Sequence, residues 1–276
     1  MKRRAFIRNA AGLLVTAGFP GIIRAAGFSS GNRGLGGDDG FILRPWPTAA
    51  PASYIAYASG FALGWVRARY GLTGCVDGKT GIFSGWIKPR VDDCDRVLIS
   101  TTSNAAYSQF QVYLNAANKV EIYGADIDST IILTLTSNGT YTTASGWIHI
   151  YGSWDLSTGR AVLYVNGAND LASGSLLTNA AINYTSGSFL IGLNDNSMST
   201  DIELCEMYFN SAAYLDDPSK FIAGGKPISL GSTGSLPTGT APVLYLKNPY
   251  DSFATNSGTG GNLGFMDASL TQETPP

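Results

Sequence analysis

The sequence predicts an all-β protein, folded as a two-sheet antiparallel jelly-roll sandwich. Charged residues make up only 14% of the 276 residues, so Ser, Thr, Asn and Gly must supply the polar surface. Short segments alternate apolar and polar residues, and Gly, Asn, Asp and Ser separate these segments. No long segment has a convincing helical period. About ten short alternating segments of this kind are typical of a two-sheet sandwich.

Each predicted strand is justified by its own alternation or apolar run. In residues 108–114, for example, Phe110 and Val112 alternate with Gln111 and Tyr113. The predicted strands are residues 81–88, 96–100, 108–114, 119–123, 130–136, 147–154, 160–166, 188–193, 200–209 and 242–247. We expect the buried core to include Phe83, Ile87, Phe110, Val112, Ile148, Ile150, Leu163 and Val165. The one helix expected in the body is near residues 217–223, because Asp217 can cap a first turn that begins with Pro218.

The first 26 residues resemble a twin-arginine export signal. Arg3 and Arg4 are followed by Phe6, Ile7 and Arg8 in the order of that signal, and a short Gly-containing apolar stretch comes next. That stretch is too short and too Gly-rich to span a bilayer stably. We therefore expect a periplasmic or extracellular protein that meets the membrane only through this segment. An ordinary amphipathic N-terminal helix is the alternative.

Composition divides the remaining chain into three parts. Residues 27–53 form a Gly/Pro-rich linker, residues 54–247 the jelly roll, and residues 248–276 a tail rich in Gly, Ser and Thr. We expect these two Gly-rich arms to flank one domain, with the tail either disordered or pinned to a partner.

The charge balance argues against nucleic acid as a partner. Five of the 18 basic residues and none of the 20 acidic residues lie within residues 1–25. Thirteen basic residues against 20 acidic residues leave the rest of the chain with a net charge of −7. Such a body has no electrostatic reason to hold a phosphate backbone.

The three cysteines, Cys75, Cys94 and Cys205, predict no zinc site. None forms a C-x-x-C pair, and the chain has one histidine. All three can be buried as small hydrophobic residues. A Cys75–Cys94 disulfide is the alternative in an oxidising compartment.

Four segments resemble successive strands of a laminin-G-like domain of the concanavalin A-like lectin and glucanase superfamily. They are residues 81–99, 108–124, 147–167 and 187–209, and the most specific piece is the hairpin over residues 154–167. The resemblance covers about residues 60–247. Residues 224–231 and 252–261 are similar to segments of tailed-phage and prophage structural proteins. The resemblance implies a jelly roll with an open concave face and with loops at one rim that can hold a sugar or calcium.

Some glucanases of this superfamily carry acidic residues that alternate along one strand. Here the pattern is incomplete, because a period of two places Asp201 and Glu203 on one face and Glu206 on the other. A retaining glycosidase needs two carboxyl groups about 5 Å apart, a distance that Asp201 and Glu203 could approach. A solvated outer face at the start of a strand is the alternative for these two residues. His149 lies within a strand without a nucleophile-elbow sequence, so we expect it to pack among aromatic residues. The sequence thus predicts no enzyme and no catalytic residues.

The candidate ligand residues lie on loops. Asn194, Asp195 and Asn196 join two predicted strands at a rim, although Asn and Asp also favour simple turns. Trp154 could stack on a sugar or lie in the core. Calcium is a possible cofactor at residues 194–196 or at the acidic loops 92–95 and 126–128, and no other cofactor is expected.

These features predict a non-catalytic binding or adhesion module that recognises carbohydrate or another cell-surface polymer. It would be exported or borne on a particle. One alternative is a purely structural phage or prophage protein that contacts other virion proteins. A degenerate glycoside hydrolase is the other.

Overall fold

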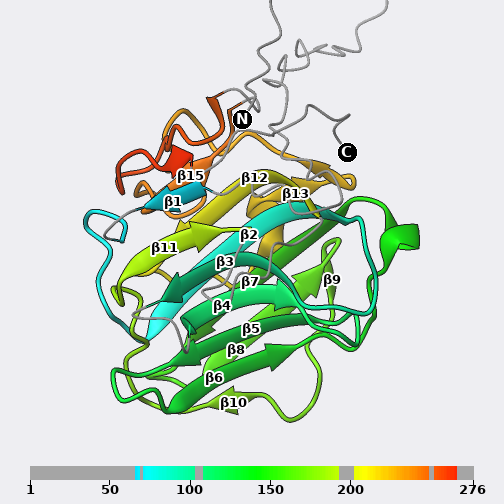
Figure 1. The fold of residues 1–276 in the computed structure, drawn as a ribbon, viewed down its shortest axis with the longest axis horizontal. Helices are drawn as coiled ribbons and strands as arrows, with labels where there is room; N and C mark the ends of the chain where they lie inside the picture. The colour runs from blue at the N-terminus through cyan, green and yellow to red at the C-terminus, as the bar shows by residue number, and fades with distance from the viewer. Residues whose placement is uncertain (1–65, 69–70, 103–107, 193–201, 249–251, 266–276) are drawn as a thin grey trace, which may run out of the picture. The chain divides into compact units, whose positions relative to one another are not determined.

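The structure is a computed structural model, and it describes residues 66–68, 71–102, 108–192, 202–248 and 252–265. The signal-like segment and residues 193–201 lie outside these ranges. Within the described ranges the chain is all-β and forms two large antiparallel sheets, as the alternations predict. Figure 1 shows strands β3 to β6 of the larger sheet in front of β7 and β8 of the smaller one.

The larger sheet has eight strands in the order β10–β6–β5–β4–β3–β11–β1–β16. Its centre is a meander in which β3, β4, β5 and β6 pair with their neighbours in sequence. The strands are β1 (Val66–Ala68), β3 (Arg96–Thr102), β4 (Ser108–Leu114), β5 (Val120–Ala125), β6 (Ile131–Thr136), β10 (Leu176–Leu177), β11 (Ser188–Ile191) and β16 (Gly264–Phe265).

The smaller sheet has six strands in the order β15–β12–β2–β7–β8–β9. They are β2 (Thr80–Pro89), β7 (Ile148–Asp155), β8 (Arg160–Val165), β9 (Ala168–Asn169), β12 (Ile202–Asn210) and β15 (Leu244–Leu246). The short strands β1, β9, β10 and β16 were not predicted, because two or three residues carry too little alternation to be recognised.

The main core lies between the two sheets, and it contains all eight residues predicted for it. Aromatic rings gather at its centre: the Phe110 ring stacks on Phe209 with centroids 5.1 Å apart, and Trp154 lies 5.6 Å from Phe110. This confirms the assignment of inward and outward residues on β2, β4, β7 and β8, since a slip of one residue would reverse it.

A second apolar layer covers the outer face of the six-stranded sheet. We call residues 211–230 the cover segment; it contains the 3-10 turn η2 (Pro218–Lys220) and strands β13 (Ile222–Ala223) and β14 (Lys226–Pro227). Phe221 lies at its centre, with ring centroids 5.1 Å from Tyr151 and 5.0 Å from Tyr208. Ser153 Oγ accepts a hydrogen bond from the Leu215 amide at 3.0 Å. The outer face of this sheet is therefore largely buried by the chain itself.

The predicted helix near residues 217–223 is one 3-10 turn. The Asp217 side chain caps it as expected, since it accepts a hydrogen bond from the Ser219 amide at 2.9 Å. The chain then extends into β13, where Phe221 and Ile222 pack against the outer face of the six-stranded sheet.

The described part of the C-terminal arm is bound to the sandwich. Asn256 is buried; its side chain accepts from the Tyr245 amide at 2.8 Å and donates to the Val243 carbonyl at 2.9 Å. Farther along, β16 pairs with β1. Residues 252–265 thus continue the folded unit beyond residue 247.

None of the three cysteines forms a disulfide. Cys75 precedes β2 and Cys94 follows it, so the two lie beyond opposite ends of a ten-residue strand, which is roughly 33 Å long. This distance excludes the Cys75–Cys94 alternative, because a disulfide needs Cα atoms within about 7 Å of each other. Cys205 is buried on the outer side of β12, beside Trp86.

Candidate functional site: the open face of the eight-stranded sheet

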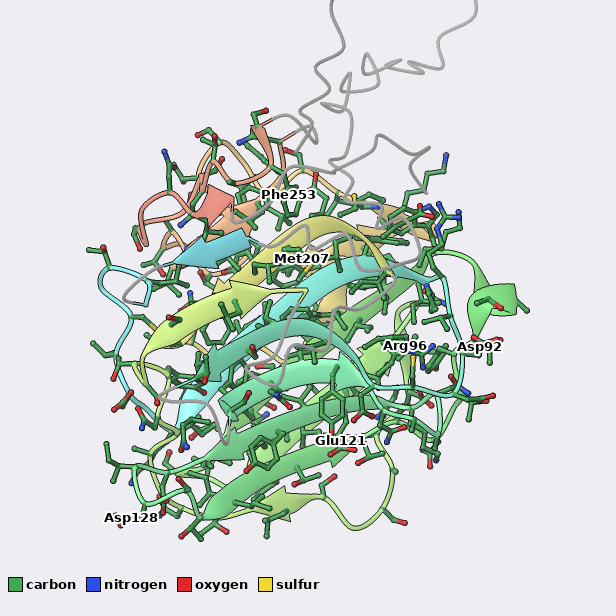
Figure 2. All side chains as sticks on the ribbon, in the orientation of Figure 1. Asp92, Arg96, Glu121, Asp128, Met207 and Phe253 are labelled. Atoms are coloured by element: carbon green, nitrogen blue, oxygen red, sulfur yellow. The ribbon has the colours of Figure 1, made fainter. Side chains whose placement is uncertain are left out.

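Part of the outer face of the eight-stranded sheet remains accessible, over β4, β5 and β6. Inward residues of these strands belong to the core, so the residues between them point outward. Six of the outward side chains are partly exposed, and we call this group the open face: Gln111, Tyr113, Glu121, Tyr123, Thr134 and Thr136. Figure 2 labels Glu121 on this front sheet.

Strand register arranges these six side chains in two rows. Gln111 pairs with Tyr123, and Tyr123 with Thr134; Tyr113 pairs with Glu121, and Glu121 with Thr136. Adjacent strands are about 4.8 Å apart and next-but-one residues about 7 Å apart. The open face therefore measures roughly 10 Å by 7 Å, and its two tyrosines are diagonal neighbours.

Hydrogen bonds hold the polar groups of the open face in place. The Tyr113 hydroxyl donates to Glu121 Oε1 at 2.6 Å, and Asn115 Nδ2 donates to Glu121 Oε2 at 3.1 Å. Gln111 Nε2 donates to Ser108 Oγ at 2.7 Å. Burial, and secondarily the hydrogen bond to Glu121, raise the pKa of Tyr113 well above its ordinary value. Tyr113 therefore keeps its proton at neutral pH.

This combination suits a hydroxyl-rich ligand. Tyrosine rings offer broad apolar surfaces with a polar tip, and neighbouring amide, hydroxyl and carboxylate groups can fix a ligand's orientation. A sheet also holds such groups more rigidly than a loop does. The signal was visible in the sequence, where Gln111, Tyr113, Glu121 and Tyr123 form the polar half of two alternating strands, but they were not predicted to be ligand residues.

Trp154 does not lie at a ligand surface. Its side chain is fully buried, and its Nε1 donates to the Tyr184 hydroxyl at 2.7 Å. The indole fits closely against β2, because a Cβ atom at Gly81 would lie 2.2 Å from Trp154 Cζ2. Stacking of this indole on a sugar is therefore excluded, and the core alternative holds. Asn194, Asp195 and Asn196 lie outside the described residues, so their role stays a prediction.

The carboxylates of β12 do not form an open catalytic pair. Glu203 is fully buried and forms ion pairs with Lys88, at 3.2 Å, and with Arg90 Nε. It is therefore part of neither an open cleft nor a solvated outer face. Asp201 lies outside the described residues.

The position predicted for Glu206 is wrong. A β-bulge between Cys205 and Tyr208 shifts the register, and Glu206 takes a left-handed backbone conformation with φ of 51°. Its carboxylate accepts from the Tyr245 hydroxyl at 3.1 Å, on the outer face of the six-stranded sheet. Glu203 and Glu206 thus share a face. Burial raises the pKa of Glu206 to about 7, although the Tyr245 hydrogen bond and Lys247 oppose the shift.

His149 packs among aromatic residues as predicted, with its ring 5.1 Å from that of Trp86. The sequence did not predict its partner: Ser84 Oγ lies 2.9 Å from His149 Nε2. Both residues are buried on the outer face of the six-stranded sheet, and burial lowers the pKa of His149 to about 3. This pair lacks the access to substrate that a nucleophile and its base require.

Internal contacts occupy the described acidic loops. Asp92 accepts from the Thr143 amide at 2.7 Å, while Asp93 Oδ1 accepts from Asn118 Nδ2 at 2.7 Å. Asp126 Oδ1 accepts from the amides of Asp128 and Thr130, as in an ordinary turn. No group of three or more His, Cys, Asp and Glu residues within the described ranges is arranged to hold a metal ion. Within the same ranges, no helix is both long and apolar enough for a membrane crossing.

The comparisons with known proteins agree with this architecture. Residues 76–209 match the family described as the concanavalin A-like lectin/glucanases superfamily. These residues therefore form a laminin-G-like domain of the concanavalin A-like type. The search of curated proteins finds no match to the chain.

Two solved structures have a similar fold. One is a heptameric SAP-like pentraxin from Limulus polyphemus: 14% identity, TM-score 0.50, with 80% of this chain and 94% of that chain covered. The other is described as a "putative carbohydrate binding protein" from Bacteroides ovatus: 12% identity, TM-score 0.55, with 81% of this chain and 60% of that chain covered. At these identities the likeness concerns the fold.

Proposed function

We propose that this protein is a non-catalytic carbohydrate-binding module whose ligand surface is the open face. The observation that carries the proposal is the pairing of two diagonal tyrosines with hydrogen-bonding side chains on one rigid, accessible sheet. The carbohydrate-binding description of the similar Bacteroides ovatus structure supports it.

The absence of catalysis is part of the proposal. Glycoside hydrolysis needs two carboxyl groups across a sugar-sized space, one of them free to attack or to accept a proton. Glu203 forms ion pairs with two cations, and Glu206 accepts a hydrogen bond from Tyr245. We expect no turnover on β-glucans or chitin at micromolar protein.

Amide hydrogen exchange of the protein, measured with a glycan that it binds, tests where the binding surface lies. The full chain is screened on an array, and amide exchange is then measured with and without the tightest-binding glycan. Protection concentrated in residues 108–136 supports the proposal. Protection confined to the cover segment, or a complete absence of glycan binding, contradicts it.

We further propose that the module works outside the cytoplasm, on the basis of the signal-like segment. Replacing Arg3 and Arg4 with Lys should trap the protein inside the cell, because the paired arginines define that signal. Unchanged export of this variant, or a mature protein that begins at Met1, contradicts the proposal. Mounting on a virion stays an alternative prediction, which co-purification with particles would support.

A further inference from the structure

The charges of the open face restrict the chemistry of its ligand. Of its six side chains, Glu121 alone is charged, and it is negative. Asp95 adds negative potential nearby, since its charge contributes to the raised pKa of Tyr113. A ligand that carries sulfate or carboxylate groups would meet like charge here.

The described cations closest in sequence to these strands are already engaged. Lys119, immediately before β5, donates through Nζ to the Ser137 and Asn138 carbonyls at 3.1 and 3.2 Å. Arg96 is buried, and its guanidinium donates to the Val91 carbonyl and to Asn118 Oδ1. Neither can approach an anionic ligand without losing these bonds, and Arg96 would also have to leave the interior.

The direction of the hydrogen bonds strengthens this restriction. Tyr113 donates its proton to Glu121, so toward a ligand its oxygen can only accept. The carboxylate of Glu121 is also acceptor-only, and one amide hydrogen of Gln111 is committed to Ser108. Toward Tyr113 and Glu121, a ligand must therefore supply hydrogen-bond donors. Sugar hydroxyls do so, whereas sulfate and carboxylate groups supply acceptors only.

We infer that the open face selects uncharged, hydroxyl-rich glycans and rejects sulfated, sialylated and uronic acid-containing ones. This inference rests on the proposed carbohydrate-binding function, and it adds the ligand class. Specificity then arises from repulsive and unpaired groups as much as from attraction.

Matched glycan pairs test the inference on the full chain. The array carries each neutral core, such as lactose, beside its 3′-sulfated and 3′-sialylated forms. We expect every bound core to favour the uncharged member by at least tenfold. We also expect binding of the neutral member to change less than twofold between 50 and 500 mM NaCl, because no ion pair is formed.

The variant Glu121→Gln tests whether the charge of Glu121 causes the preference for uncharged glycans. It should raise the affinity for the sulfated forms at least threefold at 50 mM NaCl, because the repelling charge is removed. Asp128→Asn is the matched control, because Asp128 is exposed at the turn between β5 and β6, away from Glu121 in Figure 2. Its replacement should leave unchanged the ratio of the affinities for the neutral and the sulfated glycan. Thermal unfolding verifies that both variants are folded.

The possible failures are distinguishable. Equal or tighter binding of the sulfated or sialylated members overturns the ligand class while the carbohydrate-binding function stands. An unchanged ratio in Glu121→Gln also overturns it, since the open face then does not set the selectivity. No binding to any member of any pair overturns both proposals.

Discussion

The outer faces of the two sheets are built from the same alternating pattern but meet different surroundings. On the six-stranded sheet, Tyr151, Tyr208 and Tyr245 lie beneath or beside the cover segment and are buried. On the eight-stranded sheet, Tyr113 and Tyr123 remain partly exposed. Alternation therefore fixes which side chains point outward, whereas distant segments decide which of them can meet a ligand.

The covered face should be where truncation costs the most stability. Phe221→Ala removes a ring packed on Tyr151 and Tyr208, so it should lower the free energy of unfolding by about 3–5 kcal/mol. Tyr123→Ala, on the open face, should cost less than about 1.5 kcal/mol. Urea unfolding measures both. An equal loss in the free energy of unfolding for the two variants would contradict the claim that one face is covered and the other open.

Acid should destabilise the covered face through His149. The pKa of this residue falls from 6.5 in the unfolded chain to about 3 in the folded chain because of burial. Between these values the unfolded state binds more protons, so the stability contributed by neutral His149 is lost as pH falls from 6.5 to 3, by up to about 5 kcal/mol. An NMR titration of the imidazole checks the cause; a pKa above 6 in the folded protein would contradict complete burial.

Glu206 should have the opposite effect to His149 on the pH dependence of stability. Its pKa rises from 4.5 to about 7 on folding, so the folded state binds more protons between these values. Stability from this group is therefore gained as pH falls from 7 to 4.5, by up to about 3 kcal/mol. Urea unfolding at several pH values should give a nearly flat wild-type profile between pH 4.5 and 6.5, where Glu206 offsets His149. Glu206→Gln should instead lose stability steadily with acid below pH 6.5, and a variant that keeps the flat profile would contradict this assignment.

The sequence predicted the parts of the fold that depend on regular strands. All eight expected core residues are buried, because a period of two holds wherever a strand is unbroken. The same period places Trp154 on the inward side with Ile148 and Ile150, so its burial could have been predicted. Glu206 could not be placed this way, since a bulge with a positive φ interrupts the alternation.

The cover segment was not predictable from local pattern. Its Gly, Pro and Ser residues have no strand or helix period, and its position depends on Phe221 and Leu230 meeting a sheet distant in sequence. The open face followed from the alternation of β4 and β5, but its accessibility did not. Whether an outward tyrosine is covered depends on such long-range contacts.

Two tyrosine variants test most directly the claim that the open face is the ligand surface. Tyr123→Ala removes a ring from the open face, whereas Tyr214→Ala removes one in the cover segment, beside Arg160. Glycan affinity is measured for both variants by titration calorimetry with the tightest neutral glycan from the array. The account predicts at least a tenfold loss for Tyr123→Ala and less than a twofold change for Tyr214→Ala, with both variants folded. Unchanged affinity in Tyr123→Ala, or a larger loss in Tyr214→Ala, would contradict it.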